Sequence, residues 1–266
     1  MVALGRNHPV EPWEKQLPDS SDTLNDPSGR VSILRKLAPG RIIARNQSYF
    51  GRFMTLKVCE TFYSLMGEST RVGLPAWFIR LSGCNLRCRY CDTTYAYEEG
   101  REVAMADLLK AAGKFSTRLV LVTGGEPLLQ EETLALLSGL AEAGFEVCLE
   151  TNGSRPIDRV DVRVHRILDL KCPGSGMAGE NHWENLKWLT PRDEVKFVVS
   201  DRHDFLWALG VIQEYGLSGR LPLLISPVFG QAPAQETAAW ILESRLPLRL
   251  NLQLHKYLWG PEARGK

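Results

Sequence analysis

The sequence predicts an α/β fold, a partial (truncated) TIM-like barrel of parallel strands whose functional groups gather at its C-terminal face. Short strand-like runs alternate with helical stretches, which is the rhythm of βαβ units. The strand-like runs are apolar on both faces, as expected where helices cover a parallel sheet. A chain of 266 residues with 44% hydrophobic content can bury one substantial core, so one catalytic domain is expected.

The expected strands are short apolar runs that begin just after residue 54. Between them, two stretches carry apolar side chains at helical spacing, and we expect these stripes to pack against the sheet rather than bind a ligand. Right-handed crossovers would then gather the strand ends on one face. The strands are predicted at 56–62, 76–81, 119–123, 145–150, 167–170, 195–200, 223–228 and 250–254, and the stripes consist of Leu134, Leu137, Leu140 and Ala141, and of Phe205, Leu209 and Ile212.

Residues 1–53 differ from the rest, because they contain polar, turn-forming stretches without an apolar period. We expect a loosely ordered N-terminal extension, with the catalytic domain at 54–266. Several acidic residues argue against a transit peptide. Since Met54 stands directly before the first strand, our hypothesis is that the extension reflects a start codon called too early. A deletion variant beginning at Met54 that failed to fold or lost activity would contradict it.

The overall charge points to a small-molecule partner. A formal net charge of +1 gives no general attraction to nucleic acid or to acidic membranes. No apolar stretch approaches the roughly 20 residues of a membrane helix, and no signal-peptide core opens the chain. We therefore expect a cytoplasmic protein with no direct nucleic-acid or membrane contact.

Three cysteines stand close together, as Cys84, Cys88 and Cys91 in the spacing C-x3-C-x2-C. They can ligate three irons of a [4Fe-4S] cluster and leave the fourth iron open, unlike ferredoxins, in which every iron carries a Cys. This signature is associated with chelation of S-adenosylmethionine (SAM), so radical chemistry is the leading interpretation. Zinc would need a further ligand pair that the sequence does not supply. The other cysteines, Cys59, Cys148 and Cys172, are isolated and receive no role.

The three-cysteine loop follows the strand at 76–81, so it should lie at the C-terminal face of the barrel. The next strand ends in Gly124-Gly125-Glu126-Pro127, where paired glycines let the backbone approach a ligand closely. Alone, this sequence could be an ordinary turn before a helix. After the three-cysteine loop, it resembles the element of radical SAM enzymes that contacts the methionyl amine.

Within that superfamily, the chain resembles the 7-carboxy-7-deazaguanine synthases from about residue 55 to residue 260. Two residues depart from the family's first turn: Met66 stands where Gln is usual, and Ser69 replaces a Gly. The resemblance rests on the stretches 60–69, 78–84, 90–94, 149–153, 168–173 and 253–256.

The resemblance implies a site, residue by residue. Along the expected strand, Asp169 and Lys171 should face one side and Leu170 the other. Ordinary alternatives remain for three positions: a surface cation for Arg80, strand packing for Thr123 and a structural ion pair for Asp169 with Lys171. The implied residues are Leu65, Met66, Gly67, Arg80, Thr123 and His255 for the substrate; Tyr90, Cys91, Asp92, Gly125, Glu150, Asp169, Leu170 and Lys171 for SAM; Cys84, Cys88 and Cys91 for the cluster; and Thr93 for Mg²⁺.

The implied reaction is the contraction of 6-carboxy-5,6,7,8-tetrahydropterin to 7-carboxy-7-deazaguanine with loss of ammonia, in queuosine biosynthesis. SAM would be cleaved to methionine and a 5′-deoxyadenosyl radical. The resemblance also implies a homodimer and an electron donor such as flavodoxin or ferredoxin. In some members the C-terminal carboxylate reaches the site, but the chain continues through residues 260–266 and that feature is not carried over. A glycyl-radical enzyme activase and a non-catalytic iron–sulfur carrier remain alternatives.

Overall fold

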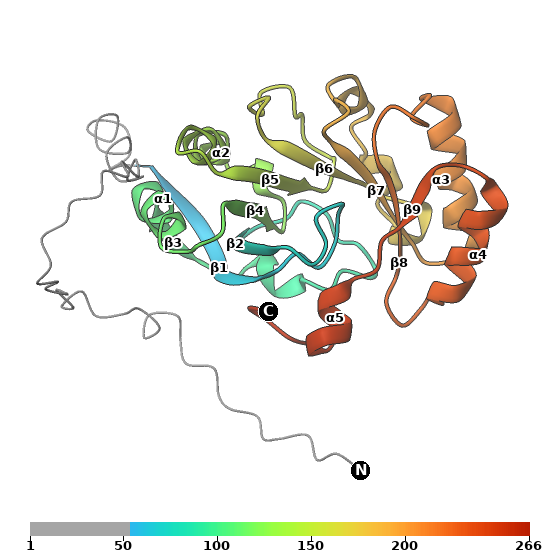
Figure 1. Cartoon of the computed structure of the whole chain (residues 1–266), viewed down its shortest axis with the longest axis horizontal. Coiled ribbons are helices and arrows are strands. Elements are labelled where there is room, and N and C mark those ends of the chain that lie inside the picture. The colour runs from blue at the N-terminus through green and yellow to red at the C-terminus, as the bar shows by residue number, and fades with distance from the viewer. Residues whose placement is uncertain (1–53) are drawn as a thin grey trace, which may run out of the picture. The chain divides into compact units, whose positions relative to one another are not determined.

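The computed structural model describes residues 54–266 and contains one nine-stranded sheet in the order β3-β1-β2-β4-β5-β6-β7-β8-β9 (Figure 1). From β2 to β9 all neighbouring strands are parallel. The edge strands β3 and β9 each pair with one neighbour, so the predicted partial barrel is confirmed. The strands are β1 (Thr55–Leu65), β2 (Pro75–Leu81), β3 (Arg101–Ala104), β4 (Leu119–Gly124), β5 (Glu146–Thr151), β6 (His165–Leu170), β7 (Glu194–Val199), β8 (Leu223–Pro227) and β9 (Leu248–Leu250).

Three details of the predicted sheet are wrong. The strand β1 is antiparallel to β2, because a short turn joins them as a hairpin. The short strand β3, which the sequence analysis missed, pairs antiparallel with β1. The expected last strand at 250–254 is also misplaced: β9 ends at Leu250, and Leu254 already begins the helix α5 (Leu254–Trp259). His255 therefore lies on a helix rather than on a terminal strand.

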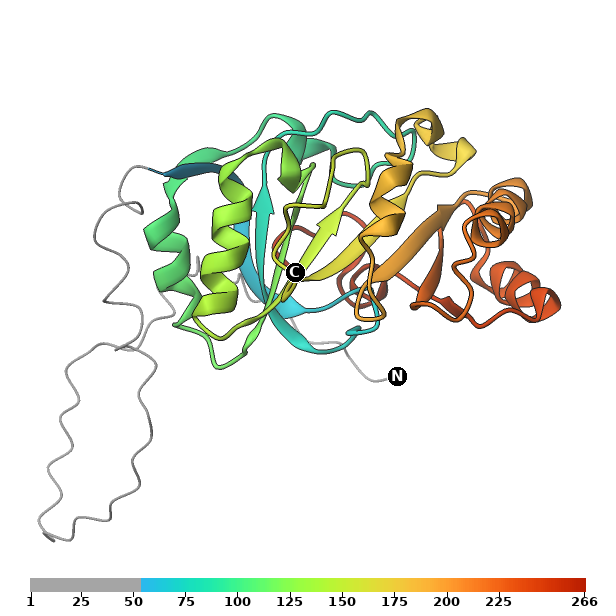
Figure 2. The ribbon, with the colours of Figure 1, turned by 90° about the horizontal axis from the view of Figure 1, so that it is seen from above.

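The helices α1 to α4 cover one face of the sheet, whereas α5 lies on the opposite, inner face (Figure 2). Both predicted apolar stripes are confirmed, since they lie on α2 and α3 and pack into the main core. Short 3₁₀ turns, not α-helices, fill the connection from β6 to β7. The covering helices are α1 (Met105–Ala112), α2 (Glu132–Glu142), α3 (Arg202–Glu214) and α4 (Ala234–Ser244).

Strand alternation places polar groups on the inner face. On β7, Val195 and Phe197 belong to the core beneath the helices, whereas Lys196 between them lines the inner cavity. On β2, Ile79 and Leu81 pack outward and Arg80 faces inward. The same rule explains why the apolar strands nevertheless carry a polar site at one end.

Two expectations concern the chain as a whole. The predicted loosely ordered extension, residues 1–53, lies outside the described residues. Within residues 54–266, no helix is both long and apolar enough to cross a bilayer.

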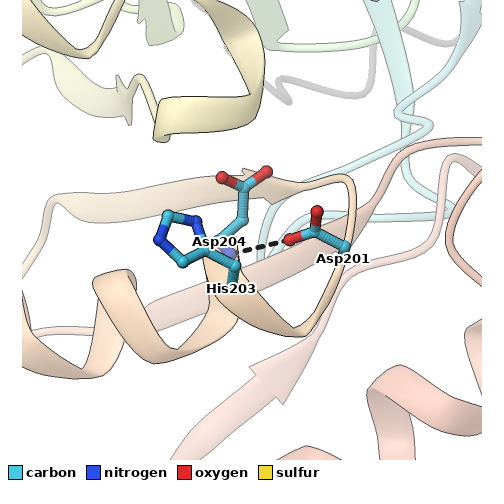
Figure 3. A group of neighbouring side chains, drawn as sticks. All are labelled: Asp201, His203 and Asp204. Carbon is cyan, nitrogen blue, oxygen red and sulfur yellow. Dashed lines mark hydrogen bonds between the residues drawn. The ribbon is translucent and has the colours of Figure 1, made fainter.

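Asp201, His203 and Asp204 gather at the start of α3 (Figure 3). The Asp201 carboxylate accepts a hydrogen bond from the Asp204 backbone N–H at 2.9 Å, which is an N-cap. Asp204 is fully buried and accepts hydrogen bonds from the backbone N–H groups of Gly174 and Ser200. Because both carboxylates already serve the backbone, we interpret the group as a helix cap.

The departure at Ser69 has a measurable consequence. Ser69 is buried in the hairpin turn with a φ of 75°, a conformation that suits glycine. Its hydroxyl accepts a hydrogen bond from the Arg71 N–H at 3.0 Å, which offsets part of the strain. We expect Ser69→Gly to be more stable than Ser69→Ala by about 1 kcal/mol, because only glycine relieves the left-handed conformation. Urea unfolding midpoints test this order, and an alanine variant equal to or more stable than the glycine variant would contradict it.

Candidate active site

The inner face of the sheet encloses a cavity of about 580 Å³ at the carboxyl ends of the strands. This volume suits small-molecule ligands. Of the residues implied by the sequence resemblance, all line the cavity except Leu170, whose side chain is buried in the core. Asp169 and Lys171 both face the cavity, as the alternation predicts. Residues from five strands, the cluster loop and the C-terminal segment thus meet in one place.

Cys84, Cys88 and Cys91 lie along one wall of this cavity. The loop that carries them is fixed to the barrel: the Tyr90 hydroxyl donates to the Val198 carbonyl at 2.9 Å, and the Arg89 N–H donates to the Ser175 carbonyl at 3.0 Å. Burial raises the pKa of the Cys84 and Cys88 thiols. Since iron ligation requires thiolates, metal binding must displace these protons.

The turn after β4 packs directly on the cysteine loop. A Cβ at Gly125 would lie 2.1 Å from the Gly83 carbonyl oxygen, so only glycine fits there. The next residue, Glu126, donates its N–H to the same oxygen at 2.7 Å. Its buried carboxylate accepts hydrogen bonds from Thr151 and Asn152 at the end of β5. The Gly-Gly-Glu-Pro element therefore joins the cysteine loop to two strand ends.

The donor set fits a cluster with an open iron and a bound polar cofactor. Three thiols point to the cavity, and one buried carboxylate oxygen, Asp169 Oδ1, has no hydrogen-bond partner within residues 54–266. Lys171 Nζ lies 3.2 Å from that oxygen and forms an ion pair with it. A ligand hydroxyl or ammonium group would satisfy it. The residues present thus match the chemistry of SAM and its cluster.

Lys196 is the central charged residue of the cavity floor, by which we mean the group formed by Lys196, Glu68, Glu150 and Asp169. The sequence analysis missed it. Its ammonium group contacts the carboxylates of Glu150, Glu68 and Asp169, the last two at 3.5 and 3.3 Å. Burial opposes the charge, but these carboxylates raise the pKa of Lys196 well above its ordinary value. The one signal available in the sequence was a lysine within an otherwise apolar strand; its pairing in register with Asp169 appears only in the structure.

Glu68 and Glu150 respond differently to the same lysine. Burial raises the pKa of Glu68 to about 7, with Lys196 opposing and neighbouring carboxylates adding to the shift. Burial also disfavours ionised Glu150, but Lys196 outweighs it and lowers the pKa of Glu150. Glu150 also accepts a hydrogen bond from the Thr123 hydroxyl at 3.2 Å. The floor therefore holds one firmly ionised carboxylate beside one that titrates near neutrality.

Arg80 lies beside this floor with its charge already partly neutralised. Its Nε donates to Glu60 at 2.8 Å, and its guanidinium carbon lies 5.9 and 6.0 Å from the ring centroids of Phe62 and Tyr95. Among the described residues, neither terminal Nη group makes a hydrogen bond. Arg80 therefore presents two oriented donors to the cavity, as recognition of a carboxylate requires.

Asp92 and Thr93 connect the cysteine loop to α5. The Asp92 carboxylate lies 2.5 Å from Lys256 Nζ and accepts a hydrogen bond from Gln253 at 3.0 Å. Although burial opposes it, these contacts lower the pKa of Asp92. The Thr93 hydroxyl donates to Asp92 at 2.9 Å, which leaves its lone pairs for a metal ion.

The predicted substrate turn and α5 contact each other directly. The Leu254 N–H donates to the Gly67 carbonyl at 2.9 Å, and a Cβ at Gly67 would lie 2.1 Å from the His255 ring. The last residues, 261–266, also line the cavity, which the sequence analysis did not anticipate. Arg264 anchors them, because its guanidinium lies 3.7 Å from the Tyr95 ring centroid and 3.0 Å from Glu99.

Comparison with known proteins agrees with this geometry. The Radical SAM superfamily model matches residues 78–170. A 7-carboxy-7-deazaguanine synthase from Chlorobaculum tepidum is 46% identical over 213 residues, covering 79% of this chain and 97% of that protein. A synthase of the same name from Koribacter versatilis is 40% identical over 225 residues, covering 79% of this chain and 100% of the relative.

The fold is also found among solved structures. The crystal structure of QueE from Escherichia coli matches with a TM-score of 0.65 at 24% identity, and the match covers 79% of this chain and 98% of that chain. At this identity, the likeness concerns the fold.

Proposed function

The chain belongs to the 7-carboxy-7-deazaguanine synthase family of radical SAM enzymes, and we propose that the cavity beside the three-cysteine loop is its active site. The protein is a carbon–nitrogen lyase that contracts 6-carboxy-5,6,7,8-tetrahydropterin to 7-carboxy-7-deazaguanine with loss of ammonia, in queuosine biosynthesis. The observation that supports this location most strongly is the meeting of the three cysteines, Arg80 and the Lys196 floor in one cavity of suitable volume.

The cofactors are a [4Fe-4S] cluster, SAM and Mg²⁺. When bound, the cluster and SAM supply a radical that removes hydrogen from the substrate. Cys84, Cys88 and Cys91 would hold the cluster. Tyr90, Gly125, Asp169 and Lys171 would line the SAM subsite, in which the Asp169 carboxylate, already ion-paired with Lys171, would accept a ligand donor. The Thr93 hydroxyl would supply one oxygen ligand to Mg²⁺.

The remaining inner-face residues suit the pterin. Its carboxylate would bind the free Nη groups of Arg80, whereas its amino-pyrimidine edge, which carries N–H donors, would face the Glu68 carboxylate. Glu150 stays with the SAM subsite, as the resemblance implies. Lys196 keeps Glu150 ionised as an acceptor. His255, Thr123 and the turn at 65–67 would complete the enclosure, which holds the substrate still and excludes water during radical chemistry.

Arg80→Lys tests the carboxylate contact. The lysine keeps the charge but loses the two-pronged donor geometry, so we expect KM for the pterin to rise about 10- to 100-fold. SAM affinity, measured without pterin, should be unchanged. Arg101, an exposed arginine on β3, provides the matched control as Arg101→Lys. An unchanged KM would rule out Arg80 as the carboxylate ligand.

Glu68 predicts a pH dependence. Because its pKa is raised to about 7, the carboxylate ionises as the pH rises through neutrality. Only the ionised form accepts two donors, so kcat/KM for the pterin should increase across this range. Glu68→Gln should lower kcat/KM and remove the increase, whereas Glu214→Gln, at an exposed glutamate at the end of α3, should keep it. If Glu68→Gln kept the full rise of kcat/KM with pH, another titrating group would be responsible for the rise.

Partners follow from the chemistry. The reaction needs a small-molecule substrate and a reductant for the cluster. We propose an acidic one-electron carrier such as flavodoxin or ferredoxin, because exposed Arg87 and Arg89 lie on the cysteine loop. We also propose a homodimer, which light scattering tests, and a cytoplasmic location, because free thiols suit a reducing compartment.

The decisive experiment is turnover by anaerobically reconstituted protein with SAM, a strong reductant, Mg²⁺ and the pterin, followed by mass spectrometry. Cluster-dependent 7-carboxy-7-deazaguanine is expected. Formation of 5′-deoxyadenosine without this product would show that the protein performs radical chemistry on a different substrate. That result would favour a glycyl-radical enzyme activase. Neither compound from cluster-loaded protein would favour an iron–sulfur carrier.

A further inference from the structure

Asn152 follows β5 and faces the cysteine loop in a fixed backbone position. Its N–H donates to Glu126 Oε2 at 2.7 Å. The Glu126 carboxylate is itself fully buried and accepts two more hydrogen bonds, from the Thr151 hydroxyl at 2.8 Å and the Leu128 N–H at 3.0 Å. Asn152 is only 8% exposed, so its side chain is confined between this support and the loop.

The hydrogen bonds of the Asn152 amide determine which way it points. Its Oδ1 accepts from both the backbone N–H and the hydroxyl of Ser154, at 3.0 and 2.6 Å. Its Nδ2 therefore faces the other side, where it lies 3.3 Å from Asn85 Oδ1 and 3.7 Å from Cys84 Sγ. A flipped amide would place an acceptor against Asn85 Oδ1 and a donor against the Ser154 N–H, so the observed orientation is the one that satisfies all partners.

A hydrogen bond to a ligating sulfur stabilises the reduced, more negative state of an iron–sulfur cluster and raises its reduction potential. Cys84 Sγ already accepts one such bond from the Leu86 N–H, at 3.4 Å. We propose that the Asn152 amide donates a hydrogen bond to the Cys84 thiolate of the cluster-loaded enzyme and raises the reduction potential of the cluster. The inference rests on the cluster assignment of the proposed function.

Potentiometric titration of the reconstituted cluster, without SAM or pterin, tests the proposal. An external one-electron reductant with mediators sets the potential, and low-temperature electron paramagnetic resonance quantifies the reduced cluster. In Asn152→Leu the donor is lost, so we expect the ratio of reduced to oxidised cluster at a fixed potential to fall about tenfold, which corresponds to about 59 mV for one electron. Asn152→Asp should lower the ratio further, because it also places a negative charge beside the sulfur.

Asn85→Ala is the matched control, because it removes the other partner of Nδ2 and leaves the contact with sulfur. Its potential should equal that of the wild type. Iron content is measured first in every variant, and a wild type without a cluster would overturn the cluster assignment itself. Cluster-loaded Asn152 variants with the wild-type potential would overturn only the proposed hydrogen bond. If Asn152→Leu fails to load, Asn152→Ala decides, because it removes the donor without adding a charge; a loaded Asn152→Ala cluster with the wild-type potential would overturn the hydrogen bond.

Discussion

Cys88→Ala is expected to abolish the iron–sulfur cluster and the cleavage of SAM together. Cys88 is the middle ligand of the loop, and within residues 54–266 Cys172 cannot take its place, because it is fully buried in the core. Without three thiolates the open-iron cluster cannot be held, so the source of the radical is lost. Iron content, visible absorption and 5′-deoxyadenosine formation should all fall to the level of unreconstituted protein.

The control for this experiment is Cys59→Ala, which removes a cysteine from β1 outside the loop. It should retain the cluster, SAM cleavage and product formation. A Cys88→Ala protein that still carries the full cluster, or that still cleaves SAM with a correctly assembled site, would contradict the assignment of ligands.

Lys196→Met is expected to have the second largest effect. The substitution leaves Glu68, Glu150 and Asp169 facing one another in a buried space without their shared cation. Removing one partner of a buried ionic group costs about 3–5 kcal/mol, and here the cost falls on stability and on the geometry of the floor. We expect the unfolding free energy to fall by that amount and kcat/KM for the pterin to fall more than about 100-fold.

A second substitution distinguishes charge from packing. Adding Glu68→Gln to Lys196→Met removes one of the uncompensated carboxylates and should restore part of the lost stability, which a double-mutant cycle quantifies. Lys187→Met, at an exposed lysine, should change neither quantity. If Lys196→Met kept wild-type stability and kcat/KM, the central role of this ammonium group would be wrong.

The sequence predicted the strand positions well because each inner strand is a compact apolar run. It could not give strand direction, since alternation of residues is identical in parallel and antiparallel strands; β1 was therefore misjudged. The strand β3 was not predicted, because it has only four residues and two of them are exposed charged residues. The helix α5 was not predicted, because a helix of only six residues is too short to show a clear apolar period.

The sequence analysis named many of the residues that line the cavity, but not Glu68, Lys196 or residues 261–266, and not the contacts among them. The motif around Cys84 and the Gly-Gly-Glu-Pro turn are local, so they are visible in the sequence. The grouping of Glu68, Glu150, Asp169 and Lys196 depends on the register of four separate chain segments, which no local pattern specifies. The wrapping of residues 261–266 around the cavity likewise arises from tertiary contacts such as that between Arg264 and Tyr95.

We propose that one cavity brings the cluster, SAM and the pterin together for hydrogen removal. The most direct test uses pterin substrate deuterated at its saturated ring carbons, in a single-turnover reaction with reconstituted protein, SAM, Mg²⁺ and reductant. We predict deuterium in the 5′-deoxyadenosine and formation of 7-carboxy-7-deazaguanine in the same reaction, with both lost in Cys88→Ala. Deuterium-free 5′-deoxyadenosine from cluster-loaded wild-type protein would contradict the claim.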